Sequence, residues 1–296
     1  MSFATAAVLL AALAQAGPLK VSKDEGTVSV AQGDKTILTY RYGDAPFKPY
    51  VKTLNTLAGV QILRDSPADH VHHRGIMYAV EVDKVDFWAE GPKSGKQVHV
   101  SLETASDKSS TRIVQKLNWV PAGADKPLLA EDRLVEIYAM SGPRLLTWRA
   151  KLRPAEGLAK VTITGSHYQG LGMRFVVSMD GQDKFLHAAG DPGPVVRGSE
   201  RVTPSRWSAY TAPTEGGLVT VALFDHPKNL RAPAGMFTMF KGFSYLAATP
   251  NVWKAPFELK TGETLDLRYG VAVWDGEPGR EEIERLHKAW LGIVGE

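Results

Sequence analysis

The sequence contains no cysteine among its 296 residues. Disulfides, cysteine-bound zinc and thiol nucleophiles are therefore excluded. The sequence also lacks a G-x-S-x-G motif, a P-loop and a G-x-G-x-x-G that opens a helix. Serine-hydrolase, nucleotide and nicotinamide chemistry thus find no support in the motifs. No stretch approaches the ~20 apolar residues that span a bilayer, so we expect no membrane span.

A strong charge of either sign is missing as well. The formal net charge is +3, and lysines and arginines alternate with acidic residues along the chain. A basic patch or a recognisable nucleic-acid motif would be needed to predict binding to nucleic acid. Neither is present, so we expect no nucleic-acid partner.

The N-terminus carries a short apolar segment. Residues 3–13 are almost wholly Ala, Val and Leu, and Ala14-Gln15-Ala16 follows them, although no Lys or Arg precedes the run. An apolar core followed by a small-x-small site is typical of a cleaved secretory signal. We expect a signal peptide over residues 1–16, a single mature domain over residues 17–296, and a periplasmic or secreted location.

After the signal, apolar and polar residues alternate with a period of two. This pattern is clearest in residues 133–138 and 145–149, and it indicates strands with one solvated face. Turn residues such as Pro121-Ala122-Gly123 separate the segments. The predicted strands include residues 27–30, 36–40, 59–64, 75–82, 97–103, 112–119, 128–140, 144–152, 159–164, 172–179, 217–224 and 264–273.

One helix is predicted, at the C-terminus. Glu281 and Glu282 lie in its first turn, and Ile283, Leu286, Trp290, Leu291 and Val294 fall on one face, which predicts core packing. Alternating β and α units are absent, which argues against Rossmann and TIM architectures. We therefore predict an all-β fold, a large antiparallel β-sandwich with one C-terminal helix.

The densest polar cluster is Asp69-His70-Val71-His72-His73-Arg74-Gly75, which holds three of the eight histidines. If this segment is extended, His70 and His72 point to one face and His73 to the other. A His-x-His pair can bind a metal, but no motif fixes a metal site here. Packed histidines that bond the backbone are the alternative. We favour a functional site and expect neither a metal nor a cofactor.

Other polar residues stand at predicted strand ends. Asp86-Phe87-Trp88 fits a sugar-binding floor or, equally, a core Trp with a capping Asp. His167 fits a general acid or base, or a structural histidine. Asp225-His226 ends a buried strand, where Asp225 either binds substrate or caps the following turn.

Several motifs together resemble the PmoA-like family ("methane oxygenase PmoA") of unknown function. They are Lys48-Pro49-Tyr50, residues 69–75, Asp86-Phe87-Trp88, residues 168–174, Arg206-Trp207 with Tyr210, residues 223–229 and residues 262–269. The resemblance implies a galactose-mutarotase-like β-supersandwich and a role in carbohydrate metabolism. In such enzymes histidines and a carboxylate carry out acid/base chemistry on a sugar.

The hypothesis is an exported enzyme acting on a small carbohydrate as an epimerase, lyase or hydrolase. The candidate catalytic residues are His70, His72, His73, His167 and Asp225, and the candidate substrate-binding residues are Arg74, Asp86, Trp88, Arg174 and His226. A non-catalytic carbohydrate-binding module and a metal-dependent enzyme using the histidine cluster are the alternatives. The sequence leaves the oligomeric state and the identity of the general base open.

Overall fold

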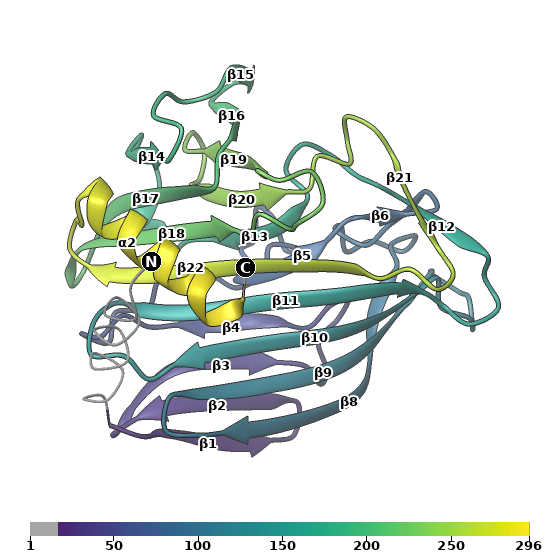
Figure 1. Cartoon of the computed structure of the whole chain (residues 1–296), viewed down its shortest axis with the longest axis horizontal. Helices are drawn as coiled ribbons and strands as arrows, with labels where there is room; N and C mark the ends of the chain where they lie inside the picture. Colours follow the sequence, from purple (N-terminus) through teal and green to yellow (C-terminus); the bar gives the residue numbers. More distant parts are fainter. Residues whose placement is uncertain (1–16, 296) are drawn as a thin grey trace.

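The computed structural model describes residues 17–295, and nearly all of its regular structure is antiparallel strand (Figure 1). The predicted all-β sandwich with one C-terminal helix is confirmed. The expected signal peptide, residues 1–16, lies outside the described residues.

Two large sheets form the layers of the sandwich. The strands of the ten-stranded sheet are, in spatial order, β1 (Leu19–Asp24), β2 (Thr27–Gln32), β3 (Lys35–Arg41), β4 (Tyr50–Leu54), β5 (Ile76–Ala79), β13 (Gly170–Arg174), β20 (Tyr245–Thr249), β19 (Gly235–Met239), β16 (Glu200–Pro204) and β15 (Val195–Arg197). Those of the eight-stranded sheet are β14 (Phe185–His187), β17 (Trp207–Thr214), β18 (Gly217–Asp225), β22 (Leu265–Asp275), β11 (Arg144–Pro154), β10 (Leu129–Tyr138), β9 (Ser110–Val120) and β8 (Lys96–Ser106).

A third, four-stranded sheet lies at one end of the molecule (Figure 1). Its strands are β21 (Phe257–Lys260), β12 (Lys160–Thr164), β6 (Glu81–Val82) and β7 (Val85–Asp86). A short 3-10 turn, η1 (Val177–Met179), follows β13.

Strand periodicity assigns side chains to two cores. In β22, Leu267, Tyr269 and Val271 belong to the main core between the large sheets. Ala272 and Trp274, of opposite parity, belong to a second core outside the eight-stranded sheet. Successive strand residues point to opposite faces, so one apolar strand supplies both cores.

Helix α2 (Arg280–Val294) covers the second core, across the outer face of the eight-stranded sheet (Figure 1). Its predicted apolar stripe is confirmed as packing, because Ile283, Leu286 and Trp290 are buried there. Among residues 17–295, no helix has the length and apolar character needed to cross a membrane.

The predicted strand over residues 59–64 is wrong. This segment makes only isolated bridges, between Asn55 and Gln61 and between Leu63 and Phe175. The Gln61 side-chain oxygen accepts hydrogen bonds from the backbone N–H groups of Leu54, Ile62 and Leu63. A side chain therefore satisfies donors that a neighbouring strand would otherwise pair.

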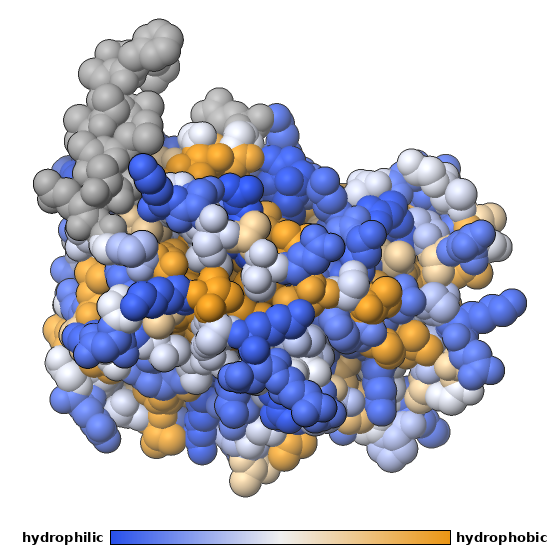
Figure 2. Space-filling model, turned by 90° about the horizontal axis from the view of Figure 1, so that it is seen from below, coloured by the Kyte–Doolittle hydropathy of each residue, from blue (hydrophilic) through white to orange (hydrophobic). Residues whose placement is uncertain are grey.

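The surface carries scattered apolar side chains. Figure 2 shows hydrophobic residues in small groups between hydrophilic ones on the face seen from below. Exposed valines occur on β8 and β9, namely Val98, Val100 and Val114. Isolated exposed apolar residues are normal for a folded protein and do not define a docking surface.

Candidate functional site

The three clustered histidines lie in turns, not in a strand. The His70 N–H donates to the Pro67 carbonyl at 3.0 Å, and the His73 N–H donates to the His70 carbonyl at 2.9 Å. The ring centroids of His70 and His73 are 4.8 Å apart and those of His72 and His73 are 4.6 Å apart. The expected split between two faces is therefore wrong, because alternation applies only to an extended chain.

All three imidazoles line one cavity of about 320 Å³, which we call the histidine cavity. Strands β15, β16, β19 and β20 of the ten-stranded sheet supply much of its wall. Its lining residues are His70, His72, His73, Trp88, Tyr168, Arg197, Glu200, Phe237, Met239, Phe243 and Tyr245. The volume is that of a pocket for a small organic ligand.

His70 and Asp69 form a carboxylate–imidazole pair. His70 Nδ1 lies 3.1 Å from Asp69 Oδ2, and the same oxygen accepts a 2.9 Å hydrogen bond from Arg174 Nη2. Desolvation raises the pKa of Asp69, but the bonds from Arg174 and His70 outweigh it and hold the pKa well below its usual range. Because an ionised carboxylate only accepts, His70 Nδ1 carries a proton and Nε2 is the basic nitrogen of the neutral ring.

His73 is held as the opposite tautomer. Its Nδ1 lies 3.4 Å from Arg174 Nη1, and guanidinium nitrogens can only donate. Nδ1 therefore accepts, and Nε2 carries the proton. Burial, with repulsion from His72, His70 and Arg174, lowers the pKa of His73 to about 2, so the ring is neutral at physiological pH.

His72 completes the histidine group. Burial, followed by the nearby charges of Lys48 and His70, lowers its pKa. Within the described residues its side chain makes no hydrogen bond, and no set of three or more His, Asp or Glu side chains is placed to hold a metal ion. The three rings instead pack against one another, and those of His70 and His73 also pack against Phe243.

Aromatic residues make up the rest of the wall. Trp88 is only 3% exposed, yet its ring borders the cavity and lies 5.6 Å from that of Tyr168. Asp86 does not line the cavity. Its carboxylate accepts hydrogen bonds from the backbone N–H groups of Trp88 at 2.7 Å and Ala89 at 3.2 Å. Asp86 thus fixes the turn that presents Trp88.

Arg74 has a structural partner. Its guanidinium forms a forked ion pair with Glu90, which also accepts a bond from Lys48 Nζ at 2.9 Å. All three side chains are buried, and none of them lines the histidine cavity. The structure therefore places Arg74 behind Trp88, whose carbonyl binds Lys48, and not against a ligand.

His167 does not line the cavity, but it contacts Glu200, which does. Its Nε2 is 2.8 Å from Glu200 Oε2, while Arg197 donates to Glu200 Oε1 at 2.7 Å. Desolvation raises the pKa of Glu200, but the bonds from Arg197 and His167 lower it overall, so Glu200 is ionised. Glu200 is the carboxylate of the histidine cavity, and sequence reasoning missed it.

Asp225 and His226 lie elsewhere. Asp225 lines a different cavity, between the end of β18 and α2, and its carboxylate accepts bonds from Asn229 Nδ2 and the Ala234 N–H, both at 2.7 Å. His226 Nε2 faces the Gly295 carbonyl at 3.0 Å. The structure does not bring this pair to the histidine cluster, so the candidate residues do not all lie in one site.

Arg174 is likewise a supporting residue. It is 1% exposed and its guanidinium stacks 3.7 Å from the centroid of the Phe243 ring. From this position it binds Asp69 and His73 at once.

Several residues that line the cavity were not predicted from the sequence, among them Tyr168, Glu200, Phe237, Phe243 and Tyr245. Only Tyr168, adjacent to His167, had a local signal.

The β-sandwich is similar in fold to part of several α-galactosidases of known structure. The galactosidase domain of "alpha-galactosidase-sucrose kinase, AgaSK" has a TM-score of 0.50 at 9% identity, over 86% of this chain and 41% of that one. The α-galactosidase from Lactobacillus brevis has a TM-score of 0.53 at 8% identity, over 92% and 41%. A GH36 α-galactosidase AgaA variant from Geobacillus stearothermophilus, in complex with stachyose, has a TM-score of 0.50 at 10% identity, over 92% of this chain and 42% of that one.

The chain spans only about two fifths of those proteins, and at this identity the likeness concerns the fold alone. Residues 27–288 match the model described as "Family of unknown function (DUF6807)", and the chain belongs to that family. The expected membership of the PmoA-like family is therefore wrong. No curated protein matches the sequence.

Proposed function

We propose that the histidine cavity binds a sugar or modified sugar and acts on it by acid/base chemistry, as an epimerase, lyase or hydrolase. The observation that carries the proposal is the pairing of tautomers. His70 and His73 face one aromatic-walled cavity, one with a basic Nε2 and the other with a protonated Nε2. A proton acceptor and a proton donor that face one substrate are what acid/base catalysis requires.

In this scheme His70 Nε2 takes a proton from the substrate, and Asp69 stabilises the imidazolium that forms. His73 Nε2–H donates a hydrogen bond to an oxygen on which negative charge develops. Arg174 orients both rings through Asp69 and His73 Nδ1 without touching the substrate. Such positioned donors contribute most where water is excluded.

The wall supports a sugar as the ligand. Trp88, Tyr168 and Phe243 offer flat apolar surfaces, which suit the C–H faces of a pyranose ring. Glu200 adds a carboxylate that accepts hydrogen bonds from hydroxyl groups. The carbohydrate-active enzymes of similar fold are a further, weaker support.

A thermal-shift screen of neutral and oxidised sugars tests the binding step. A ligand that binds the folded state at 100 times its Kd stabilises by about 2.7 kcal/mol, which is a measurable rise in Tm. We expect a saturable rise for the wild type that Tyr168→Ala reduces and Tyr42→Ala, outside the cavity, does not. No rise with any sugar would refute the proposal. Binding without turnover would favour the carbohydrate-binding module.

We also propose that the chain is exported, on the strength of the apolar run and the Ala14-Gln15-Ala16 site. Expression with residues 1–16 fused to a reporter enzyme that is active only outside the cytoplasm tests this. An inactive reporter would refute export.

A further inference from the structure

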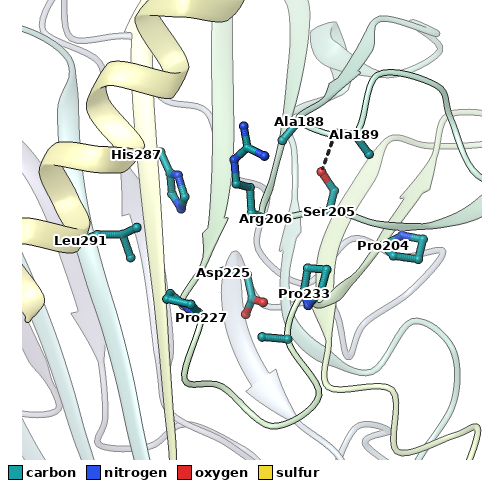
Figure 3. A pocket seen from close by; sticks show the side chains of 11 residues that line it. Ala188, Ala189, Pro204, Ser205, Arg206, Asp225, Pro227, Pro233, His287 and Leu291 are labelled. Carbon is teal, nitrogen blue, oxygen red and sulfur yellow. Dashed lines mark hydrogen bonds between the residues drawn. The ribbon is translucent and has the colours of Figure 1, made fainter. Parts of the chain in front are cut away.

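A second cavity, of about 470 Å³, lies between α2 and the segment that follows β18 (Figure 3). We call it the α2 cavity. Most of its wall is apolar, and its lining residues are Ala188, Ala189, Pro204, Ser205, Arg206, Asp225, Pro227, Ala232, Pro233, His287 and Leu291. None of them lines the histidine cavity.

The carboxylate of Asp225 is buried in this wall without a counter-charge. The residue is 2% exposed, and the groups that donate to its carboxylate, Asn229 Nδ2 and the backbone N–H groups of Ala234 and His226, are all neutral. No cationic side chain in the described part of the chain lies within 4.0 Å of it. Burial raises the pKa of Asp225 to about 6, so the group is still mostly ionised at pH 7. A carboxylate has about four lone-pair sites, so at least one remains free.

The imidazole of His287 is the second unusual group. It is 3% exposed, and its ring nitrogens make no close hydrogen bond within residues 17–295; the one backbone group that bears on the ring is the Asp225 carbonyl, which accepts from one nitrogen and leaves the other vacant. Figure 3 shows this ring projecting from α2 into the cavity on the side of Asp225. Burial lowers the pKa of His287, so the ring is neutral and one nitrogen is a vacant acceptor. Buried polar groups are almost always paired, so a vacant ring nitrogen points to a ligand.

Arg206 does not neutralise Asp225. Its guanidinium forms an ion pair with Glu284 at 2.9 Å and, in Figure 3, extends away from the Asp225 carboxylate. The cavity therefore combines one uncompensated negative charge, one vacant acceptor nitrogen and apolar walls.

We propose that the α2 cavity binds a small organic cation, a primary amine with a short apolar chain. The ammonium group donates hydrogen bonds to Asp225 and to the acceptor nitrogen of His287. The chain packs against Pro204, Pro233 and Leu291. An amine supplies both the counter-charge and the donors that the site lacks, whereas an anion would face the carboxylate and a neutral alcohol would leave its charge unpaired.

Calorimetric titration with n-butylammonium, n-butanol and sodium butyrate at one pH and ionic strength tests the proposal. These probes share an apolar chain and differ in charge. We expect 1:1 binding of the amine at least tenfold tighter than that of the alcohol, and no binding of butyrate. Equal affinity for amine and alcohol, or no amine binding, would overturn the proposal.

Variants locate the bound amine. Asp225→Asn places an amide nitrogen where donors from Asn229 and Ala234 already point, so it is expected to disturb the turn after β18. His287→Leu is therefore the primary test. We expect His287→Leu to weaken amine binding at least fivefold, because it removes the acceptor nitrogen from the cavity. Ala189→Trp, at an exposed rim position, should also weaken binding, and Tyr168→Ala in the histidine cavity should not. Amine binding that survives His287→Leu, or that Tyr168→Ala abolishes, would refute the site.

Discussion

Arg174 Nη2 donates a 2.9 Å hydrogen bond to Asp69 Oδ2, although the two residues are 105 positions apart in the sequence. Arg174 ends β13, and Asp69 lies in the turn before β5, the strand that pairs with β13. Pairing of these strands therefore brings the guanidinium under the histidine turn. Through this contact and the one to His73, a single buried cation sets which nitrogen each ring presents to the cavity.

Replacement of Arg174 should be costly to the fold. Arg174→Ala leaves Asp69 and His73 without their partner and opens a space beside Phe243, so we expect a loss of roughly 3 kcal/mol in unfolding free energy. Arg174→Lys keeps the charge but not the fork that reaches two acceptors, and it should recover only part of the loss. Urea denaturation measures both. The matched control, Arg153→Ala, removes a half-exposed ion pair and should cost less than about 1 kcal/mol.

Among the histidines, His70 should matter most for turnover. With a sugar identified by the binding screen, His70→Ala should lower kcat by ~10²–10⁴-fold, the usual contribution of a general base. Asp69→Asn should lower kcat by a smaller factor, since it removes only the stabilising charge. Steady-state kinetics of His167→Ala provides the comparison, because His167 contacts Glu200 and not the cavity. A larger loss of kcat in His167→Ala than in His70→Ala would contradict the assignment.

The neutral state of His73 has a consequence for acid stability. Its pKa is about 2 in the folded protein and ~6.5 when unfolded, so below pH 6.5 the unfolded chain binds a proton that the folded one does not. Stability from this group is present above pH 6.5 and is lost as the pH falls. Between pH 7 and pH 5 the loss is about 2 kcal/mol from His73 alone. Urea denaturation at pH 7 and at pH 5 measures this loss. The decrease in unfolding free energy between the two pH values should be about 2 kcal/mol smaller in His73→Gln than in the wild type. An equal decrease in both proteins would argue against a neutral His73.

The buried group of Lys48, Arg74 and Glu90 supports Trp88. Glu90→Gln removes one negative charge from between two buried cations, and we expect a loss of about 3–5 kcal/mol in unfolding free energy. Glu258→Gln, in the exposed pair with Lys160, is the control and should cost less than about 1 kcal/mol. Similar small losses in both variants would mean that the buried group does not hold the wall of the cavity.

Most of the fold could be read from local pattern. In β10 buried and half-buried residues alternate because one side of the sheet is buried, and α2 shows its apolar stripe at helical spacing. The segment over residues 59–64 was misread because its apolar residues resemble a strand. It makes only isolated bridges, and the Gln61 side chain accepts bonds from part of its backbone.

The site was harder to predict for a geometric reason. His70, His72, His73 and Trp88 were found because they are close in sequence, and they do line one cavity. Glu200 comes from β16 and Phe243 from the connection between β19 and β20, and only the sheet order β13-β20-β19-β16 brings them to the same wall. Arg74, Arg174 and Asp225 were expected at the substrate, but their charges are used inside the protein or at another cavity.

Proton NMR of a bound sugar incubated with the protein in D₂O tests the central claim most directly. Epimerisation or elimination would replace a C–H proton by deuterium or create an unsaturated product, and hydrolysis would create a new reducing end. We expect the spectrum of the sugar to change with time in the presence of the wild type. This change should be at least 100-fold slower with His70→Ala, while both proteins still bind the sugar. A spectrum that stays unchanged with a sugar that binds the wild type would contradict acid/base catalysis in the histidine cavity.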